Sequence, residues 1–428
     1  TTGSCNIIIG CKVDVPDITG NNQLAIGAGT SIWVSGTSDF NVGIGTTNPS
    51  SRLSVAGDAC VSGVITATNF AKADGSSLGG FSPDAQNNLY AGTNAGAASD
   101  ADTTFNVGIG FKSGTALNEG DENILIGTYT GCALTSGFTN VMVGKNAGKR
   151  ITTGKCNVFL GCAAGCGASS GTISGSCNVA IGDEALAGLT EGTLNVAIGR
   201  RAGYAINSGT GNVFLGANAG CDLTTGTCNI GIGYHAMQDG TVTGGNNIAL
   251  GKLSLEQLTS GTDNIAIGQC AMETGAVTGT HNIAIGCKAA KGITSAEANI
   301  FIGRGAGIND TITGNQNVVL GSYAATNITS GGCNIILGKS AASNLTTGGK
   351  NIAIGSYNFN LPSATDNCQL AIGMGSKYWV TGNSDFNVGI GTTTATSRLT
   401  VAGDACVSGV ITAANFAKAD GSSLGGFS

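Results

Sequence analysis

Residue types that carry most enzyme chemistry are few and scattered in this chain. There are two histidines, His235 and His281, and both flank turns. Asp183 and Glu184 are adjacent, and adjacent side chains on a strand face opposite sides. A catalytic site needs several such groups converging on one place, and no such group of residues stands out. Glycine strings such as Gly43-Ile44-Gly45 belong to a repeat and precede no helix, so they do not indicate a dinucleotide site.

Cysteine is the other reactive side chain, with 15 copies. The closest approach to zinc spacing is Cys162 and Cys166, separated by three residues, and no His lies nearby to complete a site. Cys156 and Cys177 share one repeat position on successive turns, where parallel Cβ vectors make a bridge awkward. We expect cysteine to serve as a small hydrophobe and most thiols to be free, with Cys166 the favoured exception. The sequence therefore predicts no enzyme, no catalytic residue, no cofactor and no metal.

The composition differs from that of an ordinary globular protein. Glycine supplies 73 of 428 residues, and charged residues make up 10%, against roughly 25% in typical soluble domains. The net charge of −6 gives no basic patch, so nucleic acid is not an expected partner. No apolar run is long enough to span a membrane, so membrane insertion is not expected. The chain opens and stops within its own patterns, and we interpret it as an excerpt of a longer polypeptide.

A short repeat organises most of the chain. Its signature is the pentad N-φ-x-φ-G, where φ is Val, Ile or Leu, and the Asn is numbered as position zero. Eighteen pentads follow one another from Asn88 to Asn387, with Gln369 in place of Asn. Successive pentads begin 17 or 18 positions apart, except for one longer interval of 21 between Asn157 and Asn178. Such a period predicts an all-β, parallel β-solenoid with one coil of chain per repeat.

Each repeat position has an expected role in the coil. Positions +1 and +3, such as Val196 and Ile198, alternate as on a strand and are expected to fill the core. Gly199 at +4 provides a corner with positive φ. Ala202 at +7 is small enough for a second short strand to lie across a narrow core. The extra residues of the long repeat are expected in a surface loop, with Asn157 and Asn178 still stacked.

The Asn column is expected to form a ladder. Identical amides stacked at the strand spacing of about 4.8 Å can hydrogen-bond along the axis of the coil. The predicted ladder consists of Asn106, Asn123, Asn140, Asn157, Asn178, Asn195, Asn212, Asn229, Asn247, Asn264, Asn282, Asn299, Asn317, Asn334 and Asn351.

Position +2 is apolar throughout, although it is expected to point away from the core. We interpret it as a seam between chains of a homotrimer; a two-fold pair or a layer from the same chain is the alternative. The predicted seam residues are Leu125, Met142, Phe159, Ala180, Ala197, Phe214, Ala249, Ala266, Ala284, Phe301, Val319 and Ile336. A charge at this position, as in Ala266→Asp, is then expected to disrupt assembly before the fold, whereas Gln269→Asp at position +5 should be neutral.

A second, longer repeat joins the solenoid blocks. Residues 38–82 recur as residues 384–428 with 40 of 45 identities, at an offset of 346. We expect this connector to form an intertwined, β-rich neck. The domains are therefore predicted as 1–45, the end of a preceding solenoid block; 46–87, a connector; 88–391, a solenoid of eighteen turns; and 392–428, a second, truncated connector.

The pattern N-V-A-I-G-x-x-A at Asn195–Ala202 and Asn282–Ala289 resembles the head repeats of trimeric autotransporter adhesins, although the turns are longer here. The longer turn, with T-T-G-x-x-N, is more similar to tail-fibre-like proteins of bacteriophages and other large viruses, whose modules are joined by segments like Asn41–Val55. This resemblance implies a trimer, an extracellular position on a virion or cell-surface appendage, and a role in attachment to a host receptor.

We therefore expect a structural shaft built from tandem copies of the long repeat, with other copies of the chain as its partner. A bacterial surface adhesin is the first alternative. An ice-binding solenoid is an alternative of another class, since Thr pairs such as Thr152-Thr153 and Thr224-Thr225 recur; only one Thr of each pair can lie on a given face.

Overall fold

The computed structural model describes residues 3–15, 17–56, 83–168, 173–240 and 242–412. Contacts divide the chain into two compact units, residues 1–78 and 79–428. Much of each connector, residues 57–82 and 413–428, lies outside the described residues. The prediction of an intertwined neck falls largely on these segments.

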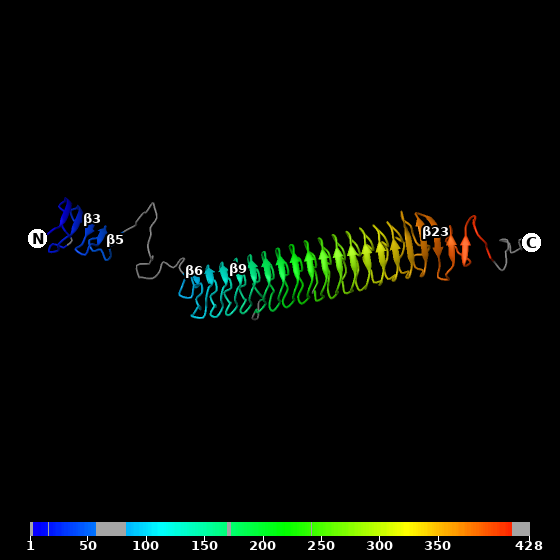
Figure 1. Ribbon diagram of the computed structural model, residues 1–428, viewed down its shortest axis with the longest axis horizontal. Helices are drawn as coiled ribbons and strands as arrows, with labels where there is room; N and C mark the ends of the chain where they lie inside the picture. The colour runs from blue at the N-terminus through cyan, green and yellow to red at the C-terminus, as the bar shows by residue number, and fades with distance from the viewer. Residues whose placement is uncertain (1–2, 16, 57–82, 169–172, 241, 413–428) are drawn as a thin grey trace, which may run out of the picture. The chain divides into compact units, whose positions relative to one another are not determined.

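The larger unit is a parallel β-solenoid in which each turn contributes one short strand to a single continuous sheet (Figure 1). Its described residues form strands and turns without a helix. The parallel strands are β6 (Leu89–Ala91), β7 (Val107–Ile109), β8 (Ile124–Ile126), β9 (Val141–Val143), β10 (Val158–Leu160), β11 (Val179–Ile181), β12 (Val196–Ile198), β13 (Val213–Leu215), β14 (Ile230–Ile232), β15 (Ile248–Leu250), β16 (Ile265–Ile267), β17 (Ile283–Ile285), β18 (Ile300–Ile302), β19 (Val318–Leu320), β20 (Ile335–Leu337), β21 (Ile352–Ser356) and β22 (Leu370–Met374).

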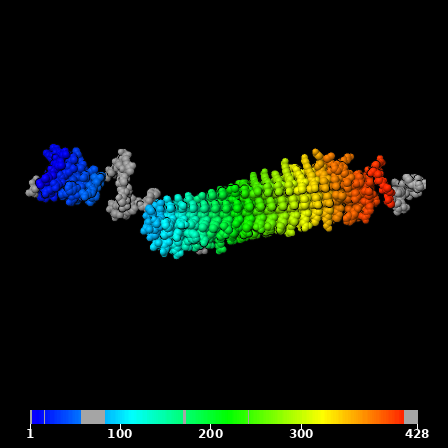
Figure 2. Space-filling model, viewed as in Figure 1, coloured from blue at the N-terminus to red at the C-terminus, as the bar shows by residue number. Residues whose placement is uncertain are grey.

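Successive strands pair in strict register, so each repeat position forms a column along the coil. In β16 and β17, for example, Ile265 pairs with Ile283, Ala266 with Ala284 and Ile267 with Ile285. The predicted all-β, parallel solenoid with one turn of chain per repeat is confirmed. Figure 2 shows the successive turns as parallel ridges along this unit.

The structure reverses the expected orientation of the strand residues. The side chains at position +2 point inward and are fully buried within a single chain, as at Phe159, Phe214 and Ala266. The side chains at positions +1 and +3, such as Ile265 and Ile267, point outward and are half-buried. From β6 to β20 the strands are only three residues long, so the single middle residue is the one that faces the core.

The predicted interchain seam is therefore wrong as a set of residues. All of its members lie in the core of their own chain, and the alternative of cover by the same chain is the one observed. They are Leu125, Met142, Phe159, Ala180, Ala197, Phe214, Ala249, Ala266, Ala284, Phe301, Val319 and Ile336. Ala266→Asp should accordingly act on the fold itself, since it buries a carboxylate in an apolar core.

Core packing depends on a volume match between positions +2 and +8 of the same turn. Where +2 is Leu, Met, Tyr or Phe, +8 is glycine: a Cβ on Gly220 would lie 2.5 Å from the ring of Phe214, and one on Gly165 would lie 2.7 Å from the ring of Phe159. In several turns with a small +2 residue, +8 is large and buried, as with Ala266 and Met272, although Ala197 is followed by Gly203 and Ala284 by Ala290. Close packing at near-crystalline density requires this compensation.

The far side of the coil consists of tight turns instead of the expected second strand. Ala271 at +7 is fully buried, but it sits between left-handed residues, Cys270 at φ 58° and Met272 at φ 51°. Gly268 at +4 has φ 128°, and a Cβ there would lie 2.7 Å from the backbone of Gly286 in the next turn. The predicted glycine corner is thus present, and it is required both by φ and by the stacking of turns.

The long repeat is accommodated without breaking the column of strands. Strand β10 pairs with β11 in the same register as its neighbours. The backbone N–H of Asn178 donates to Oδ1 of Asn157 at 2.9 Å. The stacking predicted for these two residues is therefore found, while part of the inserted loop, residues 169–172, lies outside the described residues.

The parallel stack ends earlier than the repeat pattern indicates. After β22 the chain turns back as β23 (Lys377–Gly382), which pairs antiparallel with β22 and with β24 (Val388–Ile390); β24 then pairs in parallel with β25 (Leu399–Val401). The pentad at Asn387 is therefore separated from the stack by an antiparallel strand. Periodicity missed β23 because this strand carries no pentad.

The smaller unit repeats this arrangement by itself. Its strands are β1 (Ile7–Cys11), β2 (Leu24–Ala28), β3 (Ser31–Gly36), β4 (Val42–Ile44) and β5 (Leu53–Val55). Strand β3 pairs antiparallel with β2 and β4, in the same registers as β23 with β22 and β24. The two chain reversals are thus separated in the sequence by one complete copy of the long repeat.

The volume match predicts that one substitution can rescue another. We expect Phe214→Ala to lower the free energy of unfolding by about 3–5 kcal/mol, because it leaves a cavity in a fully buried site. Adding Gly220→Met should recover part of this loss, since it recreates the pairing of Ala266 with Met272. Urea unfolding of both variants gives the measurement. Gly220→Met alone should lower the free energy of unfolding more than Phe214→Ala or the double variant does. A double variant that is no more stable than Phe214→Ala would contradict the volume match.

Candidate functional site

The Asn column forms a continuous hydrogen-bonded ladder inside the coil. In one rung, Nδ2 of Asn264 donates to Oδ1 of Asn247 at 3.1 Å and to the carbonyl oxygen of Gly279 at 2.9 Å. Oδ1 of Asn264 accepts the backbone N–H and Nδ2 of Asn282, both at 3.0 Å. Each amide therefore joins three turns of chain.

The structure places every predicted ladder residue in this buried column. All fifteen have no exposed surface, namely Asn106, Asn123, Asn140, Asn157, Asn178, Asn195, Asn212, Asn229, Asn247, Asn264, Asn282, Asn299, Asn317, Asn334 and Asn351. The ladder ends where Gln369 donates its backbone N–H to Oδ1 of Asn351 at 2.7 Å. Because buried amides are costly unless all their groups are paired, this column is a structural element, and little of it is accessible to a ligand.

A continuous accessible apolar surface of the solenoid lies on the outer face of the sheet. We call this the outer aliphatic face; it consists of the side chains at positions +1 and +3 of β6 to β22, which are Val, Ile or Leu apart from Ala91. Exposed members include Leu215 at 45%, Ile335 at 43% and Ile124 at 40%. The face contains no charged side chain. At about 4.8 Å per strand, it is about 75 Å long and roughly 10 Å wide, larger than the roughly 300–600 Å² patch of a typical monomer.

The outer aliphatic face continues through the chain reversal. Along β21 to β25 the paired residues are Ile354, Ile372, Val380, Ile390 and Val401. Ile390 is 39% exposed and Val401 is 37% exposed. The alternation of faces therefore survives the change of strand direction.

On the opposite face of the same strands, the core becomes polar. The residues that succeed Ala371 there are Thr381, Gly389 and Thr400. The first unit has Ser35, Gly43 and Ser54 at the matching places. The more apolar side of the connector strands is therefore the outward one, and a hydrophobic core within one chain does not account for their order.

The groups considered for catalysis are dispersed. Asp183 and Glu184 each lie beside an arginine of the next turn, Arg200 at 3.9 Å and Arg201 at 3.5 Å. Nε2 of His281 lies 3.8 Å from a carboxylate oxygen of Asp263. These pairs are largely exposed and belong to separate turns.

His235 stacks on Tyr234 with ring centroids 3.8 Å apart, and its Nε2 lies 3.1 Å from Nδ2 of Asn218. Desolvation lowers the pKa of His235, which favours the neutral form of its ring. No carboxylate or cysteine completes a nucleophilic arrangement with it among the described hydrogen bonds.

The 14 described cysteines are free. Those at position −1, including Cys156 and Cys177, are exposed, which differs from the expectation of small buried hydrophobes. Cys221 and Cys270 are buried, and desolvation is the main cause that raises the pKa of each thiol to about 11. Cys166, the favoured exception, is also free, and Sγ lies 3.6 Å from the carbonyl oxygen of Ala187.

The Thr hydroxyls at position +12 serve the coil internally. Oγ1 of Thr152 donates to the carbonyl oxygen of Ile173 at 3.1 Å, and Oγ1 of Thr329 to that of Thr346 at 3.2 Å. In the pairs that begin at Thr152 and Thr346, the hydroxyl of the first Thr is therefore engaged with the next turn, and the second Thr, such as Thr153, is exposed.

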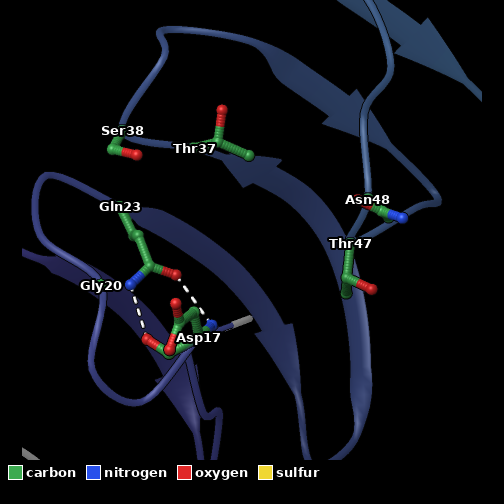
Figure 3. Close-up of a pocket in the computed structure, with 7 residues that line it drawn as sticks. All are labelled: Asp17, Gly20, Gln23, Thr37, Ser38, Thr47 and Asn48. Carbon is green, nitrogen blue, oxygen red and sulfur yellow. Dashed lines mark hydrogen bonds between the residues drawn. The ribbon is translucent and has the colours of Figure 1, made fainter.

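A polar cleft lies beside each chain reversal. The first, of about 390 Å³, is lined by Asp17, Gly20, Gln23, Thr37, Ser38, Thr47 and Asn48 (Figure 3). The second, of about 490 Å³, is lined by Pro362, Ser363, Thr365, Asp366, Asn367, Gln369, Gly382, Asn383, Ser384 and Thr393. Sequence periodicity gave no sign of either cleft, because both depend on the antiparallel strands.

The described residues contain no group of three or more His, Cys, Asp or Glu side chains placed to hold a metal ion. No helix in the described parts of the chain is suited to crossing a membrane. Comparison with protein-family models gives no match, and comparison with curated proteins gives none either.

The ladder generates a prediction about stability. Asn264→Ala removes both Nδ2 donations and leaves the two donors of Asn282 without their acceptor. Because each buried, unpaired group costs about 1–3 kcal/mol, we expect a loss of several kcal/mol in the free energy of unfolding. Urea denaturation followed by circular dichroism gives the measurement. Gln269→Ala, at the exposed +5 position of the same turn, is the control and should stay within about 0.5 kcal/mol of wild type; equal effects of the two changes would contradict the role of the ladder.

Proposed function

We propose that this protein is the structural shaft of an extracellular fibre, assembled from parallel copies of the chain that pack through their outer aliphatic faces. The observation that carries this proposal is the length and uniformity of that face. Apolar patches of this size on soluble proteins mark sites of association. The connector strands add a second argument, because their apolar side is the outward one.

A homotrimer is the proposed assembly. All chains of a fibre run in one direction, so the copies are related by rotation about the fibre axis, as in cyclic oligomers. The outer aliphatic face has two columns, +1 and +3, and in a three-fold arrangement the +1 column of each chain packs on the +3 column of its neighbour. The trimer expected from the +2 column thus rests on different residues of the same strands.

The proposed setting is a virion or cell-surface appendage, built from tandem copies of the long repeat and serving attachment to a host receptor. The repetition of the whole chain reversal in both units supports a modular shaft. A bacterial surface adhesin has the same shaft and differs in what lies beyond it. For ice binding, the internal hydrogen bonds of the +12 hydroxyls leave a single exposed Thr per pair, which favours a structural role.

The proposed interface can be tested by placing charges on the outer aliphatic face and comparing them with charges at other repeat positions. We expect the wild-type chain to sediment at three times the mass of one chain. The combined variant Ile230→Asp, Ile265→Asp and Ile300→Asp places three carboxylates on the outer face, where burial against a neighbour is costly. It should sediment as a folded single chain with an unchanged circular dichroism spectrum.

Two controls separate assembly from folding. The combination Ala217→Asp, Gln269→Asp and Ser322→Asp adds the same charge at position +5 and should leave the trimer intact. Ala266→Asp, one residue from Ile265, should lose the β spectrum because it affects the core. A wild-type protein that sediments as a single chain would overturn the proposed assembly, and twice the chain mass would overturn its three-fold symmetry.

A further inference from the structure

One polar cleft lies beside each chain reversal. Of its two walls, one is nearly identical in sequence between the two copies and the other differs. One wall is the connector, which is nearly identical in the two copies and supplies Ser38 with Thr47, or Ser384 with Thr393. The other wall is the loop before β2 or β22, where residues 12–23 and 358–369 share only Pro, Thr, Asn and Gln, at Pro16, Thr19, Asn21 and Gln23 in the first copy. Both clefts are therefore polar, although the sequence of one wall differs between the two copies.

The loop wall is held rigidly by the Gln that replaces Asn in the ladder. Oε1 of Gln23 accepts the backbone N–H of Asp17 at 2.9 Å, and Nε2 donates to the carbonyl oxygen of Asp17 at 2.6 Å. Gln369 holds Ser363 through the same two atoms, at 2.8 and 2.9 Å. Figure 3 shows Gln23 bonded to Asp17, with Thr47 and Asn48 on the opposite wall. The loop wall is therefore pre-organised for ligand binding.

Each cleft has one carboxylate, although it comes from a different place. Asp17 opens the loop in the first copy, where the second has Ser363; Asp366 closes the loop in the second copy, where the first has Gly20. In the first cleft the carboxylate accepts the N–H of Thr19 at 2.9 Å and its hydroxyl at 2.8 Å through one oxygen, Oδ1. The second oxygen remains available as an acceptor.

The remaining polar side chains of the two linings are neutral, and several of them are accessible. Ser38, Thr47 and Asn48 are exposed, and their side chains make no hydrogen bond to another described residue. Ser384 and Thr393 are their counterparts. No Lys or Arg lines either cleft, so phosphate and sulfate have no countercharge there. The linings contain no aromatic side chain, and Pro362 in the second cleft is their one aliphatic side chain.

We propose that both clefts bind a neutral saccharide. Sugar hydroxyls donate to the single carboxylate, which gives strong charge-assisted bonds, and they exchange weaker bonds with the Ser, Thr and Asn side chains. Volumes of about 390 and 490 Å³ fall in the range of small-ligand sites. The clefts are formed by one chain, so this binding does not depend on the proposed fibre. In a fibre, several clefts would act together and strengthen a weak single contact.

The test uses the complete chain and saturation-transfer NMR. The probes are glucose, galactose, mannose, fucose and N-acetylglucosamine, with glucose 6-phosphate as an anionic comparison. We expect transfer to at least one neutral sugar. The double variant Thr47→Val and Thr393→Val removes one free hydroxyl from each cleft and should weaken binding about tenfold, the effect of one hydrogen bond to a ligand.

The matched control is Thr153→Val with Thr225→Val, which makes the same change at two exposed solenoid positions and should leave binding unchanged. Absence of transfer to every neutral sugar would overturn the proposal. So would binding that is unaffected by Thr47→Val and Thr393→Val, or a preference for glucose 6-phosphate. Sedimentation of the same samples reports on assembly separately, so the saccharide proposal and the fibre proposal can fail independently.

Discussion

The stacking of one turn on the next at the strand spacing is the constraint on which the structure depends. Parallel pairing alone would tie together only a short strand of each turn. The buried Asn extends that tie to the corner of the coil, because one side chain bonds the preceding Asn, the following Asn and the carbonyl oxygen of a glycine near the end of the same turn. In a low-dielectric interior such bonds polarise one another, so a continuous column is stronger than its separate rungs.

This constraint explains why the turns tolerate unusual backbone. Residue −1 of most turns is left-handed, as at Asp263 and His281, although neither is glycine. The left-handed conformation is unfavourable for such residues, but it allows the backbone N–H to donate to a carbonyl oxygen of the preceding turn. The N–H of Asp263 donates to Gly245, and that of His281 donates to Thr262. The side chains at these positions point to solvent and are free to vary, which accounts for the mixture of Cys, His, Asp and Leu in this column.

The repeat and the parallel solenoid could be predicted from the sequence because both are periodic. The direction of the strand side chains could not be predicted. In a strand of three residues, alternation is equally consistent with one side chain facing the core and with two. A signal was nevertheless present: Leu, Met, Tyr or Phe at position +2 occurs with Gly at +8, and in several turns Ala or Gly at +2 occurs with Leu or Met at +8. Volume compensation of this kind identifies core partners, and it would have placed Phe214 and Ala266 inside. The antiparallel strands β3 and β23 and their clefts carry no repeat and needed the structure.

The antiparallel strand that follows β22 also fixes a length. A parallel coil of identical turns has no intrinsic end, and an open end with unpaired N–H and C=O groups invites further strands. Strand β23 covers that edge with backbone of opposite direction, while Phe359 and Leu361 close the core beneath it. A block can then gain or lose whole turns by duplication, each changing its length by about 4.8 Å, without any change at the joints. The chain reversal acts as a terminator, and the number of turns between two reversals sets the span of each module.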